Sequence, residues 1–205
     1  MTRAMVEVRR EGPLTFIGLD RPDKLNALDQ ALCDELSAAL RQLRHERSIL
    51  VVHSTTPGIF VSGADIAELI ERDAEIGMRG VNAQRLALPP PHRRPPAAAI
   101  AGPARGGGRE LALARDLRVA TGRSVFGQPE LGLGILAGAG GNWRLAQAVG
   151  TPMARRMLYT GQRLTAAQAH DAGLVDVIVA DETDLMDAAT DLATTVAGQS
   201  WRALE

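Results

Sequence analysis

The sequence predicts one α/β domain built on a largely parallel sheet. Its 205 residues, of which 45% are apolar, suit a single domain with a sizeable core. Strand-like and helix-like segments alternate along the whole chain, which is the pattern of α/β folds. The segments "ILVVHS" (49–54) and "AAAIAG" (97–102) are apolar over most of their length, as expected of strands buried on both faces of a parallel sheet.

Each expected element follows from a local pattern. Residues 26–47 carry leucines at helical spacing on one stripe, formed by Leu28, Leu32, Leu36, Leu40 and Leu43, which predicts an amphipathic helix. Five prolines between 89 and 96 fix the backbone and remove donors, so this stretch is expected to be extended. Residues 124–141 are expected to be mostly loop. The other expected elements are two strands within 5–22 around the turn "EGP", strands at 116–121 and 174–179, and helices at 66–76, 109–115, 142–150, 151–161, 165–173 and from about 184.

Composition limits the function classes. The chain has 23 basic and 24 acidic residues, so we expect neither nucleic acid nor an anionic membrane as its main partner. Cys33 is the only cysteine, which excludes an intrachain disulfide and a cysteine metal cluster. No apolar run approaches the ~18 residues of a membrane span. The first ten residues lack the apolar core of a signal peptide, so we expect a reduced, cytoplasmic protein.

The most informative motif is "PARGGGREL", in which three glycines precede a run of good helix formers. Its plainer interpretation is a flexible loop before a helix. Its functional interpretation is an oxyanion hole, because glycines let a ligand approach unpaired backbone N–H groups at a helix start. Glu110 then lies in the first helical turn, within reach of a bound ligand.

Two further segments can contribute to the same site. "FVSGADI" (60–66) is a second loop that enters a helix, where Asp65 is either a helix cap or part of a ligand site. Glu130, in "FGQPELGLG", lies among glycines and apolar residues, and burial there would raise its pKa. The helix and strand between Glu110 and Glu130 cover similar distances in opposite directions, so the chain can return Glu130 to the glycine end.

These segments together resemble the enoyl-CoA hydratase/isomerase (crotonase) superfamily. The resemblance covers nearly the whole chain, through "LDRPDKLNALD", "FVSGADIAEL", "AAAIAGPARGGGRELALARDLRVA", "FGQPELGLGILAGAGGNWRL" and "GLVDVIV". It implies a crotonase-like spiral of ββα units that assembles as a homotrimer or a dimer of trimers. We expect a core domain at 1–180 and a shortened C-terminal helical segment at 181–205, because such chains usually continue further.

The resemblance also implies roles for individual residues. The N–H groups of Ala64 and Gly107 would hold a thioester carbonyl, and Glu110 and Glu130 would act on water and substrate. We assign water activation to Glu110 and protonation to Glu130. Coenzyme A would bind along Ser62 to Ile66, including Asp65, with Lys24 as a phosphate contact.

The implied activity is reversible syn hydration of a trans-2-enoyl-CoA, in fatty acid metabolism, without a metal or redox cofactor. Alternatives are isomerisation or other enolate chemistry on an acyl thioester, and non-catalytic acyl-CoA binding. The binder alternative follows from Arg105 and Arg109, which stand where relatives usually have apolar or small residues. Arg109 would perturb the site if it reached Glu110. We expect it instead to face solvent or a neighbouring subunit.

Overall fold

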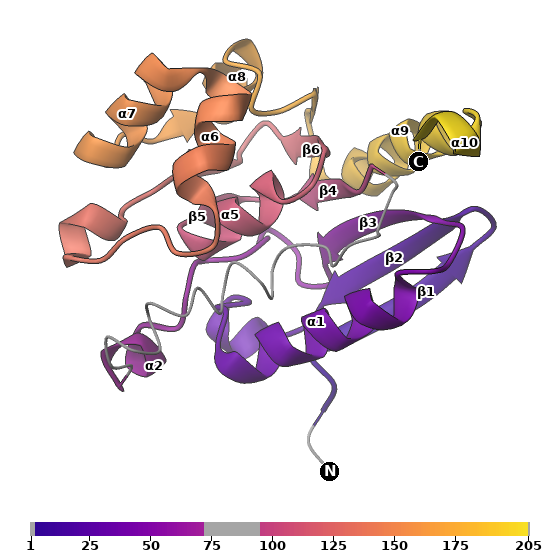
Figure 1. Cartoon of the computed structure of the whole chain (residues 1–205), viewed down its shortest axis with the longest axis horizontal. Helices are drawn as coiled ribbons and strands as arrows, with labels where there is room; N and C mark the ends of the chain where they lie inside the picture. Colours follow the sequence, from indigo (N-terminus) through magenta and orange to yellow (C-terminus); the bar gives the residue numbers. More distant parts are fainter. Residues whose placement is uncertain (1–2, 72–94, 205) are drawn as a thin grey trace.

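The computed structural model describes residues 3–71 and 95–204, which form a mixed α/β architecture (Figure 1). Its larger sheet has six strands in the order β1-β2-β3-β4-β6-β9. These strands are β1 (Val6–Glu11), β2 (Leu14–Leu19), β3 (Ile49–Ser54), β4 (Ala97–Ile100), β6 (Leu117–Thr121) and β9 (Val177–Val179). Only β1 and β2 pair antiparallel within it, and every other neighbouring pair is parallel. The expectation of a largely parallel sheet is confirmed.

Three short strands form a second, smaller sheet. The small sheet has the order β5-β7-β8, from β5 (Pro103–Arg105), β7 (Val125–Gly127) and β8 (Leu164–Thr165). A ββα unit is therefore repeated along the chain: β4 and β5 lead into α5 (Gly107–Leu113), and β6 and β7 lead towards α6 (Gly141–Val149). This arrangement brings the start of α5 next to the small sheet, where the glycine triplet lies.

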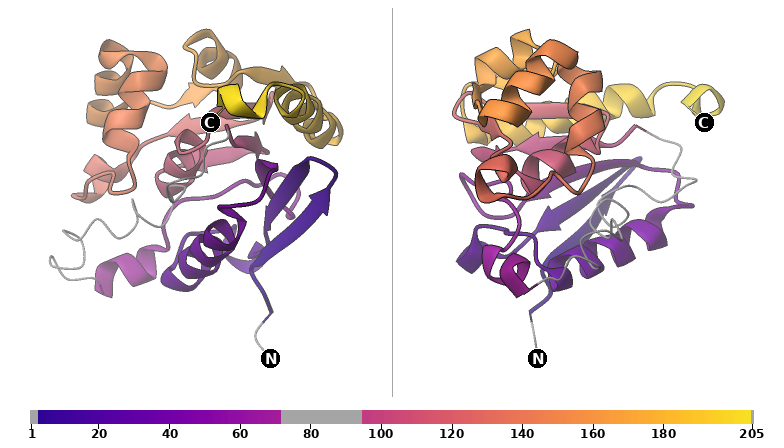
Figure 2. Two further views of the ribbon diagram at one scale, coloured as in Figure 1. Left: turned by 45° about the vertical axis from the view of Figure 1, so that its right-hand side comes forward. Right: turned by 60° about the vertical axis from the view of Figure 1, so that its left-hand side comes forward.

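Helices cover both faces of the large sheet. Successive side chains of β2 point to opposite faces of the sheet. Ile17 and Leu19 therefore belong to one apolar cluster, and Leu14 and Phe16 belong to another. The first cluster includes the buried side of α1 (Gln30–Leu43), and the second includes α9 (Leu185–Ala197). Figures 1 and 2 show α1 and α9 on opposite sides of the sheet. The helices α6, α7 (Thr151–Thr160) and α8 (Ala166–Asp171) gather at one end.

Most expected elements are confirmed, and the differences have local causes. The first long helix begins at Gln30 because the Asp29 side chain caps it, accepting a hydrogen bond from Leu32 N at 2.8 Å. Leu28 therefore precedes the helix, although its side chain is still buried. The stretch 124–141 contains β7 and a 3-10 helix at Glu130–Leu133, so it is more ordered than a loop. Several short elements were not expected, among them β5, β8 and α10 (Trp201–Leu204).

Part of the sequence expectation falls outside the described residues. The helix α2 is described over Ile66–Glu71, and the rest of the expected helix at 66–76 lies beyond it. The same holds for most of the proline-rich stretch. The division at residue 180 stays a prediction. Within the described chain, Leu185, Ala189 and Ala193 of α9 belong to the core that packs against the large sheet.

Candidate active site

Each glycine of the triplet is required for a different physical reason. Gly106 has φ 50° and ψ −123°, a backbone conformation that residues with a Cβ rarely adopt. At Gly108 a Cβ would lie 2.3 Å from the Val61 carbonyl oxygen, so this glycine permits close packing of α5 against the loop 61–64. At Gly107 a Cβ would lie 3.7 Å from Ala64 N and 3.0 Å from a terminal carbon of Leu28. Gly107 therefore leaves space beside the Ala64 amide.

The structure brings the two predicted backbone donors together. Ala64 forms a parallel bridge with Leu28, in which Leu28 N donates to Gly63 O (2.8 Å) and Asp65 N donates to Leu28 O (3.0 Å). This pattern turns the Ala64 N–H away from Leu28, and Ala64 N lies 3.7 Å from the position that a Cβ would take on Gly107. Within residues 3–71 and 95–204, neither the Ala64 nor the Gly107 N–H has a hydrogen-bond acceptor. Two neighbouring donors are thus available to one carbonyl oxygen.

Glu110 is held rigidly beside these donors. Its side chain is 3% exposed, and its Oε1 accepts hydrogen bonds from Ala139 N and Gly141 N, both at 2.8 Å. Gly141 is the first residue of α6 and Ala139 lies just before its N-cap, so α5 and the start of α6 fix the carboxylate between them. Its other oxygen makes no hydrogen bond within the described residues and is free to contact a ligand.

Glu130 reaches the same place from a different part of the chain. Its Oε1 lies 3.0 Å from the position a Cβ would take on Gly106, and Gln128 Nε2 donates to that oxygen. Its Oε2 is buried and has no hydrogen-bond partner in the described chain. The expectation that the chain returns Glu130 to the glycine end is therefore met by the geometry.

Burial governs the protonation of both carboxylates. It raises the pKa of Glu110 to about 7, although the amides of Gly141 and Ala139 favour the ionised form and oppose the rise. Burial also raises the pKa of Glu130, opposed by hydrogen bonds from its own backbone amide and from Gln128. The negative charge of Glu130 adds to the rise at Glu110. Glu110 can therefore hold a proton near neutral pH.

The raised pKa of Glu110 makes stability depend on pH. The unfolded chain loses this proton near 4.5 and the folded chain near 7, so the folded state binds more protons in between. The free energy of unfolding should therefore fall as pH rises from about 4.5 to about 7, by about 3 kcal/mol from this group. In Glu110→Gln this decline should be absent. Urea unfolding of both proteins at pH 4.5 and pH 8 measures the difference, and equal pH dependence of the two would contradict the shift.

The expectation that Arg109 faces solvent or a neighbouring subunit is wrong. Its side chain is fully buried, and its Nη1 lies 3.7 Å from Met157 Sδ of α7. The reason is that α7 packs over α5 at this position. Burial lowers the pKa of Arg109 to about 10, while the charges of Glu130 and Glu110 oppose the change. The other unusual arginine, Arg105, has its backbone close to Gly63. The buried Nε of the Arg105 side chain has no hydrogen-bond partner among the described residues.

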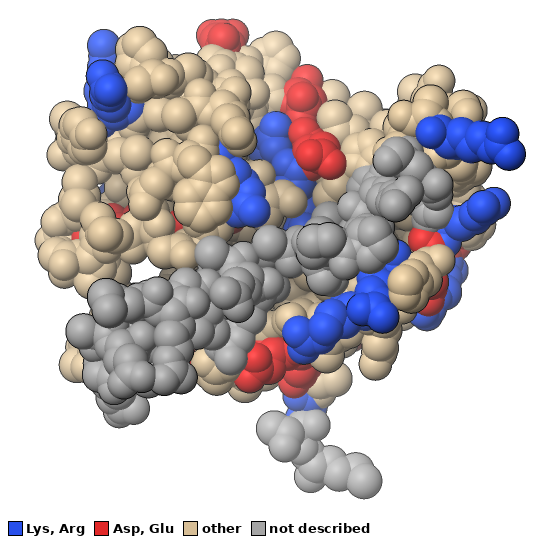
Figure 3. Space-filling model, viewed as in Figure 1, with Lys and Arg blue, Asp and Glu red and all other residues tan. Residues whose placement is uncertain are grey.

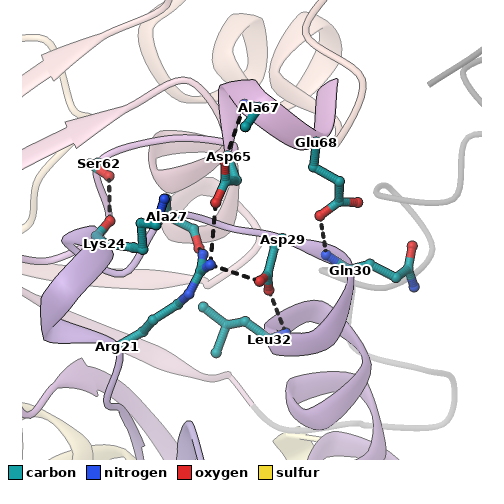
Figure 4. A network of polar contacts seen from close by, with 10 residues as sticks. All are labelled: Arg21, Lys24, Ala27, Asp29, Gln30, Leu32, Ser62, Asp65, Ala67 and Glu68. Atoms are coloured by element: carbon teal, nitrogen blue, oxygen red, sulfur yellow. Dashed lines mark hydrogen bonds and ion pairs between the residues drawn. The ribbon is translucent and has the colours of Figure 1, made fainter. Parts of the chain in front are cut away.

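Of the four residues expected to bind coenzyme A, Figure 4 shows Lys24, which ends a 3-10 helix, and Ser62 and Asp65, which precede α2. Ser62 contacts the exposed Lys24 by donating to its carbonyl oxygen at 3.5 Å. Asp65 caps α2 by accepting from Ala67 N, and it also pairs with Arg21 Nη2 at 3.2 Å. Ile66 is exposed at the start of α2. The cap interpretation of Asp65 is therefore correct, while its contact with a ligand stays a prediction.

Three residues that organise the site were missed in the sequence. Arg21 joins the two loops, because it donates to Ala27 O (2.7 Å) and pairs with both Asp29 and Asp65. Asn26 is fully buried with φ 54°, and its side chain bonds to three separate segments. Gln128 holds Glu130. Arg21 and Asn26 both lie in "DRPDKLNALD", so the sequence could have drawn attention to them. Asn in particular tolerates the left-handed backbone region, which makes it a candidate for a turn.

The described residues hold no group of three or more side chains suited to a metal ion. No helix in this part of the chain has the length and apolar character needed to cross a membrane.

Comparison with known proteins places the chain in one family. The family model described as "Enoyl-CoA hydratase/isomerase" matches residues 9–205. A short-chain-enoyl-CoA hydratase from Clostridium acetobutylicum is 35% identical, over 93% of this chain and 74% of that protein. The mouse mitochondrial enoyl-CoA hydratase domain-containing protein 2 is 40% identical over 83% of this chain, and the alignment spans 59% of the mouse protein. The chain therefore spans less than two thirds of the mouse relative.

A solved structure agrees with the sequence comparison. An enoyl-CoA hydratase from Bacillus anthracis superposes with a TM-score of 0.89 at 30% identity, over 96% of this chain and 78% of that one. A likeness over nearly the whole chain confirms the crotonase-like fold expected from the sequence. The chain belongs to the enoyl-CoA hydratase/isomerase (crotonase) superfamily.

Proposed function

We propose that the protein is an enoyl-CoA hydratase, which adds water reversibly to a trans-2-enoyl-CoA and gives a 3-hydroxyacyl-CoA. The observation that carries the proposal is the meeting of two buried carboxylates, Glu110 and Glu130, with two available backbone donors, Ala64 N and Gly107 N. Relatives whose names state hydratase activity support the same reaction.

The geometry supports a simple order of events. The thioester carbonyl accepts from Ala64 N–H and Gly107 N–H, and these donors stabilise the negative charge that develops on oxygen when C3 is attacked. One carboxylate of the pair removes a proton from water, and the other delivers a proton to C2. The bond from water oxygen to C3 forms as the C2–C3 π bond breaks, and no electrons are gained or lost overall. The proposal therefore includes no cofactor beyond the coenzyme A of the substrate.

We assign water activation to Glu110 and protonation of C2 to Glu130. Burial raises the pKa of Glu110 to about 7, so Glu110 can carry a proton in the free site, which is the reverse of this assignment. A water held between the two carboxylates can pass the proton across, since each has an oxygen without a partner in the described chain. Both carboxylates are then required, whichever is ionised first.

A spectroscopic assay tests the proposal. Loss of the enoyl absorbance of crotonyl-CoA on addition of the protein, with formation of the 3-hydroxyacyl product, is the expected result. Isothermal titration of a saturated acyl-CoA run in parallel separates the alternatives. Binding without turnover of crotonyl-CoA or of a 3-enoyl-CoA would indicate an acyl-CoA-binding protein, and turnover of the 3-enoyl substrate alone would indicate an isomerase.

The proposal extends to the setting of the enzyme. Coenzyme A would lie along Ser62 to Ile66, with Lys24 close enough to meet a phosphate, because these loops are adjacent and Lys24 is exposed. Fatty acid metabolism in the cytoplasm is the setting that we propose for this substrate.

We also expect a trimer or a dimer of trimers. Large apolar side chains are exposed at the end of the molecule that carries α6 and α7: Leu131, Leu133, Leu136, Trp143 and Tyr159. Figure 3 shows that this end of the visible face is mostly uncharged. Burial of such side chains between subunits is favourable. Sedimentation velocity at micromolar concentration measures the assembly, and a stable monomer would contradict the expectation.

A further inference from the structure

Ala64, one of the two available backbone donors, lies in a short bridge outside both sheets. The bridge joins Ala64 to Leu28 through two backbone hydrogen bonds, from Leu28 N to Gly63 O and from Asp65 N to Leu28 O. Gly63, directly before the donor, has φ 138°, in a region that only glycine adopts readily. The direction of the Ala64 N–H therefore depends on what holds the two sides of this bridge together.

A single guanidinium, that of Arg21, contacts both sides of the bridge (Figure 4). On one side, its Nη1 donates to Ala27 O at 2.7 Å and its Nη2 pairs with the Asp29 carboxylate at 2.9 Å. These two residues flank Leu28 in the chain. On the other side, the same Nη2 lies 3.2 Å from Oδ2 of Asp65, the residue directly after the donor. Arg21 thus links the residues that surround the bridge.

The surroundings of Arg21 favour a fixed geometry. The side chains of Arg21 and Asp65 are each 13% exposed, and such shielded ion pairs are screened by salt much less than surface pairs. The backbone of Arg21 is also anchored, because its N donates to Asn26 Oδ1 at 2.8 Å and Asn26 is fully buried. The planar guanidinium directs several donors from one rigid group, so it can hold a carbonyl and two carboxylates at once.

We propose that Arg21 is a positioning residue that fixes the Ala64 N–H towards the thioester oxygen by holding both sides of the bridge. A donor that is already oriented stabilises the developing negative charge without reorganisation during the reaction, and this makes its fixed direction valuable. Arg21 acts through Ala64 and does not itself contact the reacting atoms. The inference deepens the proposed hydratase function and rests on it.

The kinetic test compares kcat and KM for crotonyl-CoA in the wild type and in Arg21→Met, which keeps an unbranched apolar side chain without donors. Displacement of one oxyanion donor should lower kcat by roughly 10²-fold, because this donor acts on charge that develops in the transition state. The change in KM should be much smaller. A rise in KM at an unchanged kcat would show that Arg21 contributes only to substrate binding, and would overturn the inference.

A spectroscopic test needs no turnover. The infrared carbonyl band of butyryl-CoA, labelled with ¹³C at the thioester carbon, should move to lower wavenumber on binding to the wild type, because two N–H groups polarise the carbonyl. In Arg21→Met the band of the bound thioester should move back towards its position in solution, because the hydrogen bond from Ala64 is weakened. A band at the same wavenumber in both proteins would overturn the inference.

Arg118 of β6 supplies a matched control for the loss of a buried arginine. Its Nε donates to Leu174 O at 2.5 Å, its Nη1 donates to Arg115 O, and its Nη2 lies 3.9 Å from the Asp176 carboxylate. Arg118→Met should therefore lower the unfolding temperature, as Arg21→Met should, but leave kcat and the carbonyl band near their wild-type values. A loss of kcat that follows the loss of stability equally in both variants would reduce Arg21 to a structural residue and overturn the inference.

Asp65→Asn keeps the inference testable if Arg21→Met does not fold. An asparagine oxygen can still accept from Ala67 N and cap α2, while the charge that pairs with Arg21 is lost. The carbonyl band should move in the same direction as in Arg21→Met but by less, because Arg21 keeps its contacts with Ala27 and Asp29. An unmoved band in folded Asp65→Asn would overturn the inference.

Failure of the proposed function gives a different result from failure of this inference. A wild type that binds butyryl-CoA with the shifted carbonyl band, and whose band depends on Arg21, supports the positioning role even without hydration of crotonyl-CoA. Absence of that hydration would then count against the hydratase function alone.

Discussion

Replacing Glu110 by glutamine is expected to lower the rate of crotonyl-CoA hydration by about 10²–10⁴-fold, the usual contribution of a general acid–base group. The fold should survive, because a glutamine oxygen can still accept from Ala139 N and Gly141 N, which hold Glu110 at 2.8 Å. The variant loses the ability to exchange a proton with water. Single-turnover kinetics on crotonyl-CoA, with acyl-CoA affinity measured in parallel, give the size of the effect.

Glu130→Gln should cause a loss of the same order, since hydration needs both proton transfers. The double variant should lose much less than the product of the single losses, because groups that act as one unit are not additive. An isomerase would differ: its turnover of a 3-enoyl-CoA would be sensitive at Glu130 and tolerant at Glu110. Wild-type hydration of crotonyl-CoA by Glu110→Gln would show that the hydratase mechanism is wrong, even though the fold is right.

Gly107→Val should reduce turnover by about 10²-fold or more, the scale for loss of one oxyanion donor. A Cβ on Gly107 would stand 3.7 Å from Ala64 N, in the space that a thioester oxygen would occupy, and a branched side chain fills more of it. The donors themselves are backbone groups, so only an obstruction of this kind removes their function. The measurement is kcat/KM for crotonyl-CoA.

The control is a glycine that is far from the site and tolerates a side chain. A Cβ on Gly122 would make only ordinary contacts, at 3.8 Å from the carbonyl oxygens of Ala180 and Val179. Gly122→Val should retain most of the activity, and both variants should unfold cooperatively near the wild-type temperature. A folded Gly107→Val protein with near-normal turnover would refute the assignment of Gly107 to the hole.

Much of the fold was predictable from local sequence patterns. The leucine stripe of α1 and the apolar runs of β3 and β4 follow from the periods of helix and strand, and the structure confirms those elements. The boundaries were less predictable. Helix α1 begins at Gln30 because the Asp29 side chain bonds to Leu32 N, and β5 has only three residues and is recognisable only through its pairing with β7.

The candidate site was predictable as a set of residues, and its geometry was not. Glycines before a helix, with glutamates at 110 and 130, can be read from the sequence. The sequence does not show that Gly106, Gly107 and Gly108 serve three different purposes. That depends on which atoms approach each one: Glu130, the Ala64 amide and the Val61 carbonyl, all from other segments.

The position of Arg109 depends on long-range packing and could not be inferred from the local sequence. By itself, a charged residue in a helix is expected at the surface, because burying a charge is unfavourable. The helix period determines which face of α5 carries Arg109, and the packing of α7 decides that this face meets Met157. The family and most of the longer elements thus follow from the sequence, which also singles out Glu110 and Glu130 as candidates. Long-range packing decided which amides are available and which charges are buried together, because those contacts join residues far apart in the chain.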